Sequence, residues 1–160
     1  MVKVLLVCTG NICRSPTGEG VFRHLLAEEG LSDHIITDSC GLESWHVGKA
    51  PDPRTIAAAA KRGVDLSELR ARQIQPDDFH DFDLLLAMDG GHFNGMRDQA
   101  PKQTQDKIRM FLEPVAEAIG RLDVPDPYYG GADGFEDVLD LIEAGSRAWI
   151  SNLRNGFQPK

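Results

Sequence analysis

Two short segments of the sequence carry residue types that together could cleave a phosphate ester. The first covers residues 8–15 and reads CTGNICRS, followed by proline. A loop that precedes a helix points backbone N–H groups inward, and the helix dipole adds positive potential. Glycine and asparagine tolerate the unusual backbone angles of such a nest, and an arginine fork matches two phosphate oxygens. We therefore predict phosphate binding by Thr9, Gly10, Asn11, Ile12, Cys13, Arg14 and Ser15.

Cys8, at the start of this segment, is the candidate nucleophile. The N-terminus of a helix stabilises a thiolate, and the Ser15 hydroxyl could donate a further hydrogen bond to the sulfur. One loop could thus bind a phosphate dianion and present a nucleophile beneath it, as covalent phosphoryl transfer requires. Taken alone, Cys8 is more typical of a buried structural thiol at the end of a strand. The combination of strand, cysteine, Gly-Asn, arginine and Ser-Pro favours the nucleophile.

The second segment, residues 124–131 (VPDPYYGG), offers a carboxylic acid. Expulsion of an alkoxide or phenoxide needs a proton, and a nearby carboxyl group could supply it and then activate the water that completes hydrolysis. Prolines on both sides of Asp126 restrict the backbone and disfavour helix there. An Asp-Pro pair by itself usually marks only a turn.

Alternating strands and helices should position these segments. Apolar runs and helical periodicity predict strands at residues 2–7, 35–37, 82–88 and 108–112, and helices at 53–62 and 135–153. Another helix should open with Ser15 as N-cap and Pro16 as its first residue, and end at Gly30. We therefore predict a doubly wound α/β fold, with a four-stranded parallel sheet, helices on both faces and one domain over residues 1–160. The phosphate loop after the first strand would lie where such folds bind ligands.

Both segments resemble those of the low-molecular-weight protein tyrosine phosphatases. Residues 8–16 resemble the phosphate loop of that family, and the Asp-Pro-Tyr-Tyr run at 126–129 resembles the segment that carries its general acid. The resemblance covers essentially the whole chain. It implies hydrolysis of phosphotyrosine and small aryl phosphates, without cofactor or metal, by the catalytic residues Cys8, Arg14 and Asp126.

The same resemblance implies supporting roles for further residues. Ser39 would brace the loop through Asn11, and Asp89 would hold Arg14, although Ser39 could also be an ordinary turn residue. Cys13 resembles a family cysteine that forms a reversible disulfide with the nucleophile, or it is a small buried hydrophobe. Trp45, Tyr128 and Tyr129 would form the walls of the substrate cleft. Trp45 could equally be a residue of the hydrophobic core.

Two positions depart from the family pattern. Leu69 stands where the family has histidine, and His92 lies where the family often has asparagine. We expect both to affect how the loop is braced rather than the chemistry.

Two alternative activities share this fold. An arsenate reductase needs a relay of cysteines, and Cys40 is the only cysteine downstream of the loop. Protein arginine phosphatases tend to carry threonine at the position of Ile12, which favours tyrosine here.

Composition restricts the partners. With 17 Lys and Arg against 25 Asp and Glu, the chain carries a net charge of −8, which disfavours nucleic acid and anionic membranes. Three cysteines indicate no disulfide framework, and the N-terminal apolar run is too short for a signal peptide. We expect a cytoplasmic protein, a monomer or weak dimer, that acts on phosphotyrosine proteins, with a tyrosine kinase as a further partner.

Overall fold

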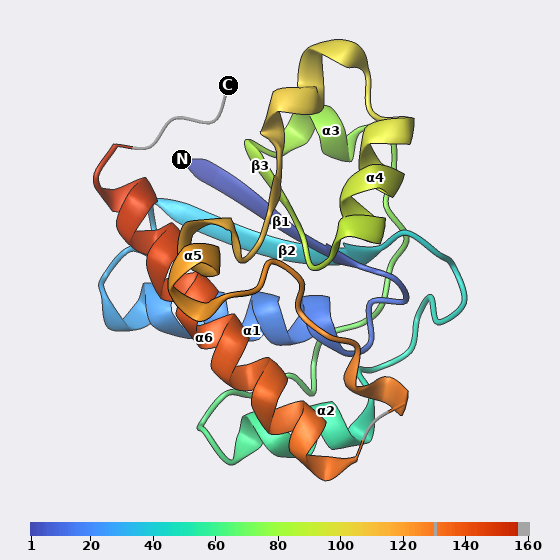
Figure 1. The fold of residues 1–160 in the computed structure, drawn as a ribbon, viewed down its shortest axis with the longest axis vertical. Coiled ribbons are helices and arrows are strands. Elements are labelled where there is room, and N and C mark those ends of the chain that lie inside the picture. The colour runs from blue at the N-terminus through green and yellow to red at the C-terminus, as the bar shows by residue number, and fades with distance from the viewer. Residues whose placement is uncertain (130, 157–160) are drawn as a thin grey trace.

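The computed structural model describes residues 1–129 and 131–156, which form a four-stranded parallel sheet covered by helices on both faces (Figure 1). The strand order is β2-β1-β3-β4, so the first strand lies inside the sheet. All three neighbouring pairs are parallel. The predicted fold class is therefore confirmed. The strands are β1 (Val2–Cys8), β2 (Ile35–Gly41), β3 (Leu84–Ala87) and β4 (Ile108–Met110).

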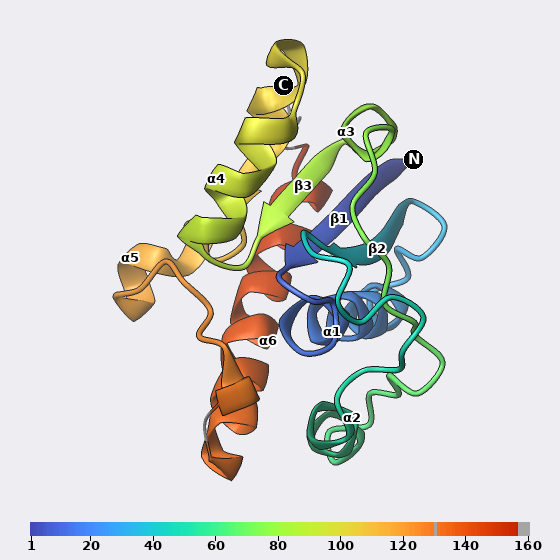
Figure 2. The ribbon, with the colours of Figure 1, turned by 90° about the vertical axis from the view of Figure 1, so that its right-hand side faces the viewer.

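Helices cover the two faces of the sheet unequally. The α-helices are α1 (Arg14–Glu28), α2 (Pro53–Ala60), α3 (Asp78–Asp81), α4 (Gly90–Gln99), α5 (Ala116–Ile119) and α6 (Ala132–Arg154). Short 3-10 turns cover η1 (Lys102–Lys107), η2 (Glu113–Val115) and η3 (Pro127–Tyr129). Figure 2 shows α1, α2 and α6 on one side of the sheet and α3 and α4 on the other.

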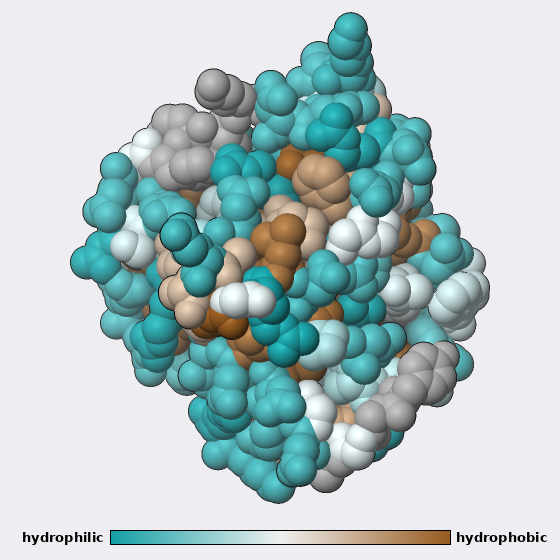
Figure 3. Space-filling view, in the orientation of Figure 1, coloured by the Kyte–Doolittle hydropathy of each residue, from teal (hydrophilic) through white to brown (hydrophobic). Residues whose placement is uncertain are grey.

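Alternate residues of β1 belong to two separate apolar clusters. Val4 and Leu6 belong to the cluster formed with α1 and α6, whereas Leu5 and Val7 belong to the cluster on the α4 side. All four are fully buried, as expected for a central parallel strand with both faces covered. The surface over α5 and α6 is mostly hydrophilic, with apolar side chains gathered near its middle (Figure 3). No helix among residues 1–129 and 131–156 is long and apolar enough to cross a membrane.

Three local predictions need correction. Helix α1 begins at Arg14, so Ser15 is not the N-cap, and its hydroxyl serves the site described below. Strand β2 continues past the predicted residue 37 to Gly41, because it pairs with β1 along the whole length of that strand. Helix α4 was not predicted, since its sequence GGHFNGMRDQ has three glycines and few apolar residues.

Candidate active site

The loop between β1 and α1 is shaped by two residues. Asn11 has a φ of 59° and is the only non-glycine residue of the described chain in the left-handed region. Asparagine tolerates this conformation better than most residues. Gly10 allows a close approach, because a Cβ there would lie 2.8 Å from Cδ2 of His46 and would displace that ring. The loop therefore turns sharply and leaves room for the His46 ring beside it.

Asn11 also fixes the hydrogen bonds beneath the loop. Its Oδ1 accepts a hydrogen bond from the Arg72 backbone N–H at 3.0 Å, and a backbone N–H can only donate. The Asn11 Nδ2 group must then face the other way, where it donates to Ser15 Oγ at 2.7 Å and Ser39 Oγ at 3.0 Å. The orientation of the amide is thus determined by the main chain.

The nucleophile candidate Cys8 is the last residue of β1 and is buried. Its Sγ lies 2.9 Å from Ser15 Oγ. Because Ser15 Oγ accepts from Asn11, its own proton is left for the sulfur or for the Cys40 carbonyl at 3.3 Å. A hydroxyl that donates to sulfur, at the first turn of α1, stabilises a thiolate more than a thiol.

Ser39 donates onward to a buried carboxyl group that sequence reasoning missed. Its Oγ lies 2.7 Å from Oε1 of Glu19. Burial raises the pKa of Glu19, although hydrogen bonds from Ser39 and Arg23 oppose that rise. The sequence signal for Glu19 was an acidic residue within the first half of α1, the half whose other residues are buried. Leu69, a predicted departure from the family pattern, packs against the apolar cluster on the α1 and α6 side of the sheet.

Arg14 is buried and held by groups from distant parts of the chain. Its Nη1 donates to Asp89 Oδ2 at 2.7 Å and to the Val124 carbonyl at 3.0 Å. Burial opposes the charge of Asp89, but the hydrogen bond from the His92 N–H, together with the charge of Arg14, lowers its pKa overall. The Nη2 group faces Asp126 Oδ2 at 3.6 Å. Contacts at Nη1 thus orient the guanidinium, and Nη2 faces the cavity.

His92 fills the space behind the loop. Its Nε2 lies 2.8 Å from Thr9 Oγ1 and 3.5 Å from Arg14 Nη2. Its Nδ1 is 3.2 Å from Asp89 Oδ1 but lacks the alignment of a hydrogen bond. Burial first, and then the positive charge of Arg14, lower the His92 pKa to about 4. Arginine can only donate, so the neutral ring accepts at Nε2 and carries its proton on Nδ1.

Asp126 lies on a loop that is tied to the sheet. The Val124 N–H donates to the Met88 carbonyl, just past the end of β3, at 2.7 Å. Two residues later the Asp126 side chain is 40% exposed, and its Oδ1 accepts from the Tyr128 N–H at 2.9 Å. The carboxyl group therefore projects over Arg14 from an anchored loop.

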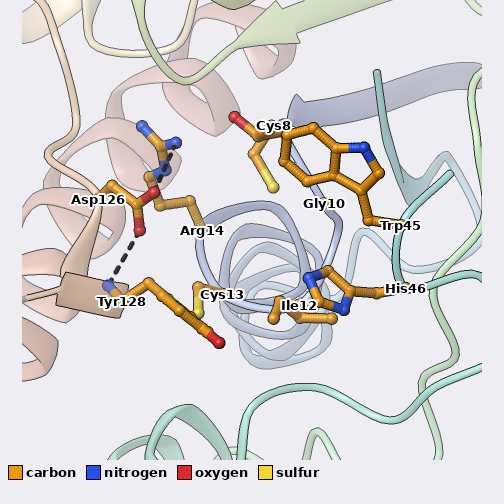
Figure 4. A pocket seen from close by; sticks show the side chains of 10 residues that line it. Cys8, Gly10, Ile12, Cys13, Arg14, Trp45, His46, Asp126 and Tyr128 are labelled. Carbon is orange, nitrogen blue, oxygen red and sulfur yellow. Dashed lines mark hydrogen bonds and ion pairs between the residues drawn. The ribbon is translucent and has the colours of Figure 1, made fainter. Parts of the chain in front are cut away.

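These groups surround one cavity of about 120 Å³ (Figure 4). Trp45 is 66% exposed and Tyr128 is 40% exposed, so both rings stand at its open side rather than in the core. The side chain of Tyr129, also predicted for the cleft, lies outside the part of the chain that is described. The lining residues are Cys8, Thr9, Gly10, Ile12, Cys13, Arg14, Trp45, His46, Asp126 and Tyr128.

The remaining predicted residues lie beside this cavity. Asn11, Ser15 and Ser39 lie beneath the loop, and Asp89 lies behind Arg14. Cys13 is buried, and burial raises its pKa to about 12, so its thiol stays protonated at neutral pH. Within the described residues no cluster of His, Cys, Asp and Glu is arranged to hold a metal ion.

Comparisons with known proteins identify the family of this chain. A family model described as low molecular weight phosphotyrosine protein phosphatase matches residues 3–158. The chain belongs to this family. A low molecular weight protein-tyrosine-phosphatase of Streptomyces coelicolor is 45% identical over 154 residues, which cover 95% of this chain and 93% of the relative.

Solved structures give the same result. A protein tyrosine phosphatase from Entamoeba histolytica, crystallised with Hepes in its active site, has a TM-score of 0.94 at 35% identity. The comparison covers 98% of this chain and 99% of that one. YfkJ from Bacillus subtilis has a TM-score of 0.92 at 37% identity, and covers 99% of this chain and 98% of its own.

Proposed function

We propose that the protein hydrolyses phosphotyrosine and small aryl phosphates through a phosphocysteine at Cys8. One observation carries the proposal: the Cys8 thiol, the Arg14 guanidinium and the Asp126 carboxyl group line the same cavity of about 120 Å³. Exposed rings of Trp45 and Tyr128 stand beside it and suit a substrate whose ester is aromatic.

In the first step the Cys8 thiolate attacks phosphorus. The S–P bond forms and the ester O–P bond breaks, while Arg14 and the loop N–H groups hold the remaining phosphate oxygens. Protonated Asp126 gives its proton to the departing phenolic oxygen, so tyrosine leaves neutral. The Ser15 hydroxyl stabilises the thiolate before attack and faces the uncharged sulfur of the phosphocysteine S–P bond afterwards.

In the second step water attacks the phosphocysteine. The Asp126 carboxylate accepts a proton from that water, the new O–P bond forms and the S–P bond breaks. Inorganic phosphate leaves, and Cys8 returns as the thiolate beside Ser15. Asp126 ends protonated, ready for the next substrate, so the cycle needs no cofactor.

The two alternative activities have less support. Cys40 is fully buried in the α4-side cluster, and burial raises its pKa well above the ordinary value. It is therefore poorly suited to carry a disulfide out to a reductant, as an arsenate reductase would need. Ile12, which lines the cavity, stands where arginine phosphatases tend to carry threonine.

The test is hydrolysis of para-nitrophenyl phosphate with a chelator present. Cys8→Ser should abolish turnover, whereas Cys40→Ala, a cysteine control outside the cavity, should retain it. Turnover by Cys8→Ser, or none by freshly reduced wild type, would contradict the proposal. Peptides that carry phosphotyrosine, phosphoserine or phosphoarginine then separate the substrate classes, and faster cleavage of phosphoarginine would favour the alternative.

The proposal extends to partners and location. Substrates would be phosphotyrosine proteins, and a tyrosine kinase is the enzyme class that forms such esters. A nucleophilic thiol needs a reducing compartment, which supports the cytoplasm. We expect a monomer or weak dimer, which sedimentation at micromolar concentration would test.

A further inference from the structure

Asp52 and Arg54, at the start of α2, connect the phosphate loop to the loop that carries Asp126. We name this pair the α2 clasp. The Asp52 N–H donates to the Ile12 carbonyl of the phosphate loop at 2.8 Å. Its carboxylate caps α2 by accepting from the Arg54 N–H at 2.8 Å. It also accepts from Arg54 Nε at 3.1 Å and Nη2 at 2.9 Å, a bidentate pair.

From this position the Arg54 guanidinium reaches the acid loop. Its Nη2 donates to the Tyr128 carbonyl at 3.2 Å. The guanidinium carbon lies 5.4 Å from the centre of the Tyr128 ring and 4.8 Å from that of Phe135, the first buried side chain of α6 described. Arg54 therefore contacts both the backbone and the ring of the residue two positions after Asp126.

Tyr128 passes this contact on to the carboxyl group. Its N–H donates to Asp126 Oδ1 at 2.9 Å, and its carbonyl accepts from Arg54. A continuous series of hydrogen bonds thus runs from Ile12 through Asp52, Arg54 and Tyr128 to Asp126. Asp52 and Arg54 therefore fix the position of the acid loop relative to the phosphate loop, and both loops must contact the same substrate.

A capping role alone does not account for the pair. The Asp52 carboxylate would cap α2 through the Arg54 N–H without any side-chain contact. The Arg54 side chain is 49% exposed, and ion pairs at such positions contribute little to stability. The Asp52 side chain, in contrast, is 7% exposed, and its hydrogen bonds with Arg54 lower its pKa, so it stays charged and holds the guanidinium in place.

We infer that Arg54 is a positioning residue for Asp126, acting through Tyr128, and that Asp52 aims it. This inference rests on the proposed role of Asp126 as general acid. A general acid must lie within hydrogen-bond reach of the leaving oxygen, and a small displacement costs much of its contribution. Loss of Arg54 should therefore matter most where protonation of the leaving group matters most.

The experiment compares kcat/KM for phenyl phosphate, a poor leaving group, with para-nitrophenyl phosphate, a good one. In Arg54→Ala the ratio of the two should shift by about tenfold in favour of the nitrophenyl ester. Arg54→Lys, which keeps the charge without the planar fork, should shift it in the same direction. Arg62→Ala is the matched control, because Arg62 also joins the α2 region to α6, through Glu136, Asp140 and Glu143. It should leave the ratio unchanged.

The Asp126→Ala background separates this inference from the proposal beneath it. Arg54→Ala should produce no further shift of the ratio there, because its effect passes through Asp126. Equal losses on both esters in Arg54→Ala, or a full shift in the absence of Asp126, would overturn the positioning role. Equal losses on both esters in Asp126→Ala would instead remove Asp126 as the general acid. Circular dichroism and thermal unfolding verify that each variant is folded.

Discussion

Replacement of His92, the buried histidine beside Arg14, should change how stability depends on pH. In the folded protein its pKa falls from the ordinary 6.5 to about 4, through burial first and then the charge of Arg14, against the opposing charges of Asp89, Asp126 and Asp123. Between these pH values the unfolded chain binds a proton at His92 and the folded protein does not. Stability is therefore lost as pH falls from 6.5 toward 4, and none is lost above pH 7.

The magnitude follows from the two pKa values. Their difference, 6.5 to about 4, corresponds at about 1.4 kcal/mol per pKa unit to roughly 3 kcal/mol in full. At pH 5 about 2 kcal/mol of this should already be lost. His92→Gln cannot titrate, and its amide can still reach Thr9. Between pH 7 and pH 5 the variant should therefore gain about 2 kcal/mol in free energy of unfolding relative to wild type.

Urea unfolding at pH 7, 6 and 5 measures this difference. His24→Gln is the control, because His24 lies on the exposed face of α1 with its side chain 41% exposed. Carboxyl groups that titrate in this range are shared by all three proteins and cancel in the comparison. A constant gap between wild type and His92→Gln from pH 7 to pH 5 would refute the reasoning, because His92 would then not be kept neutral by its surroundings.

Three further changes have defined outcomes. Ser15→Ala removes the hydroxyl 2.9 Å from Cys8 Sγ. The value of kcat/KM for para-nitrophenyl phosphate should fall by about tenfold to a hundredfold, the usual effect of losing a hydrogen bond to a charged group. An unchanged value would exclude thiolate stabilisation by Ser15. Asp89→Asn removes the carboxylate that holds Arg14 at 2.7 Å, and inhibition by inorganic phosphate should weaken by about tenfold. Equal inhibition would mean that other contacts are enough to orient Arg14. Trp149→Phe removes a buried 2.7 Å hydrogen bond to the Phe111 carbonyl and should lower the free energy of unfolding, measured in urea, by about 1–2 kcal/mol. An unchanged free energy would mean that water replaces the lost hydrogen bond.

The parts of the site that lie close together in sequence could be predicted from the residues themselves. Cys8, Asn11 and Arg14 share one strand-loop-helix unit, so their spacing limits their geometry before any long-range contact is known. The buried runs of β1 and β3 likewise predicted the sheet. Asp126 belongs to a distant segment, and only its resemblance to a family motif connected it with Cys8.

The remaining contacts depend on tertiary structure that no local pattern encodes. The Val124 carbonyl that accepts from Arg14 is a backbone atom, so side-chain types give no sign of it. Arg54 looks like an ordinary exposed residue of α2 until the acid loop is packed beside it. Helix α4 has weak propensity but is fixed by the Asp89 cap and by burial of Met96. Sequence alone could not reveal these contacts, because each joins segments far apart in the chain or uses a backbone atom.

The position of α6 has a consequence for the order in which the protein becomes active during synthesis. The ribosome releases the Cys8 loop well before α6, the helix that packs against α1 and contributes Phe135 and Trp149 to their shared apolar cluster. The acid loop directly precedes that helix. Under the proposed mechanism, a nascent chain therefore exposes the Cys8 nucleophile before the Asp126 general acid and the α6 cover have been synthesised. Under that mechanism, hydrolysis begins only after Asp126 and α6 have left the ribosome.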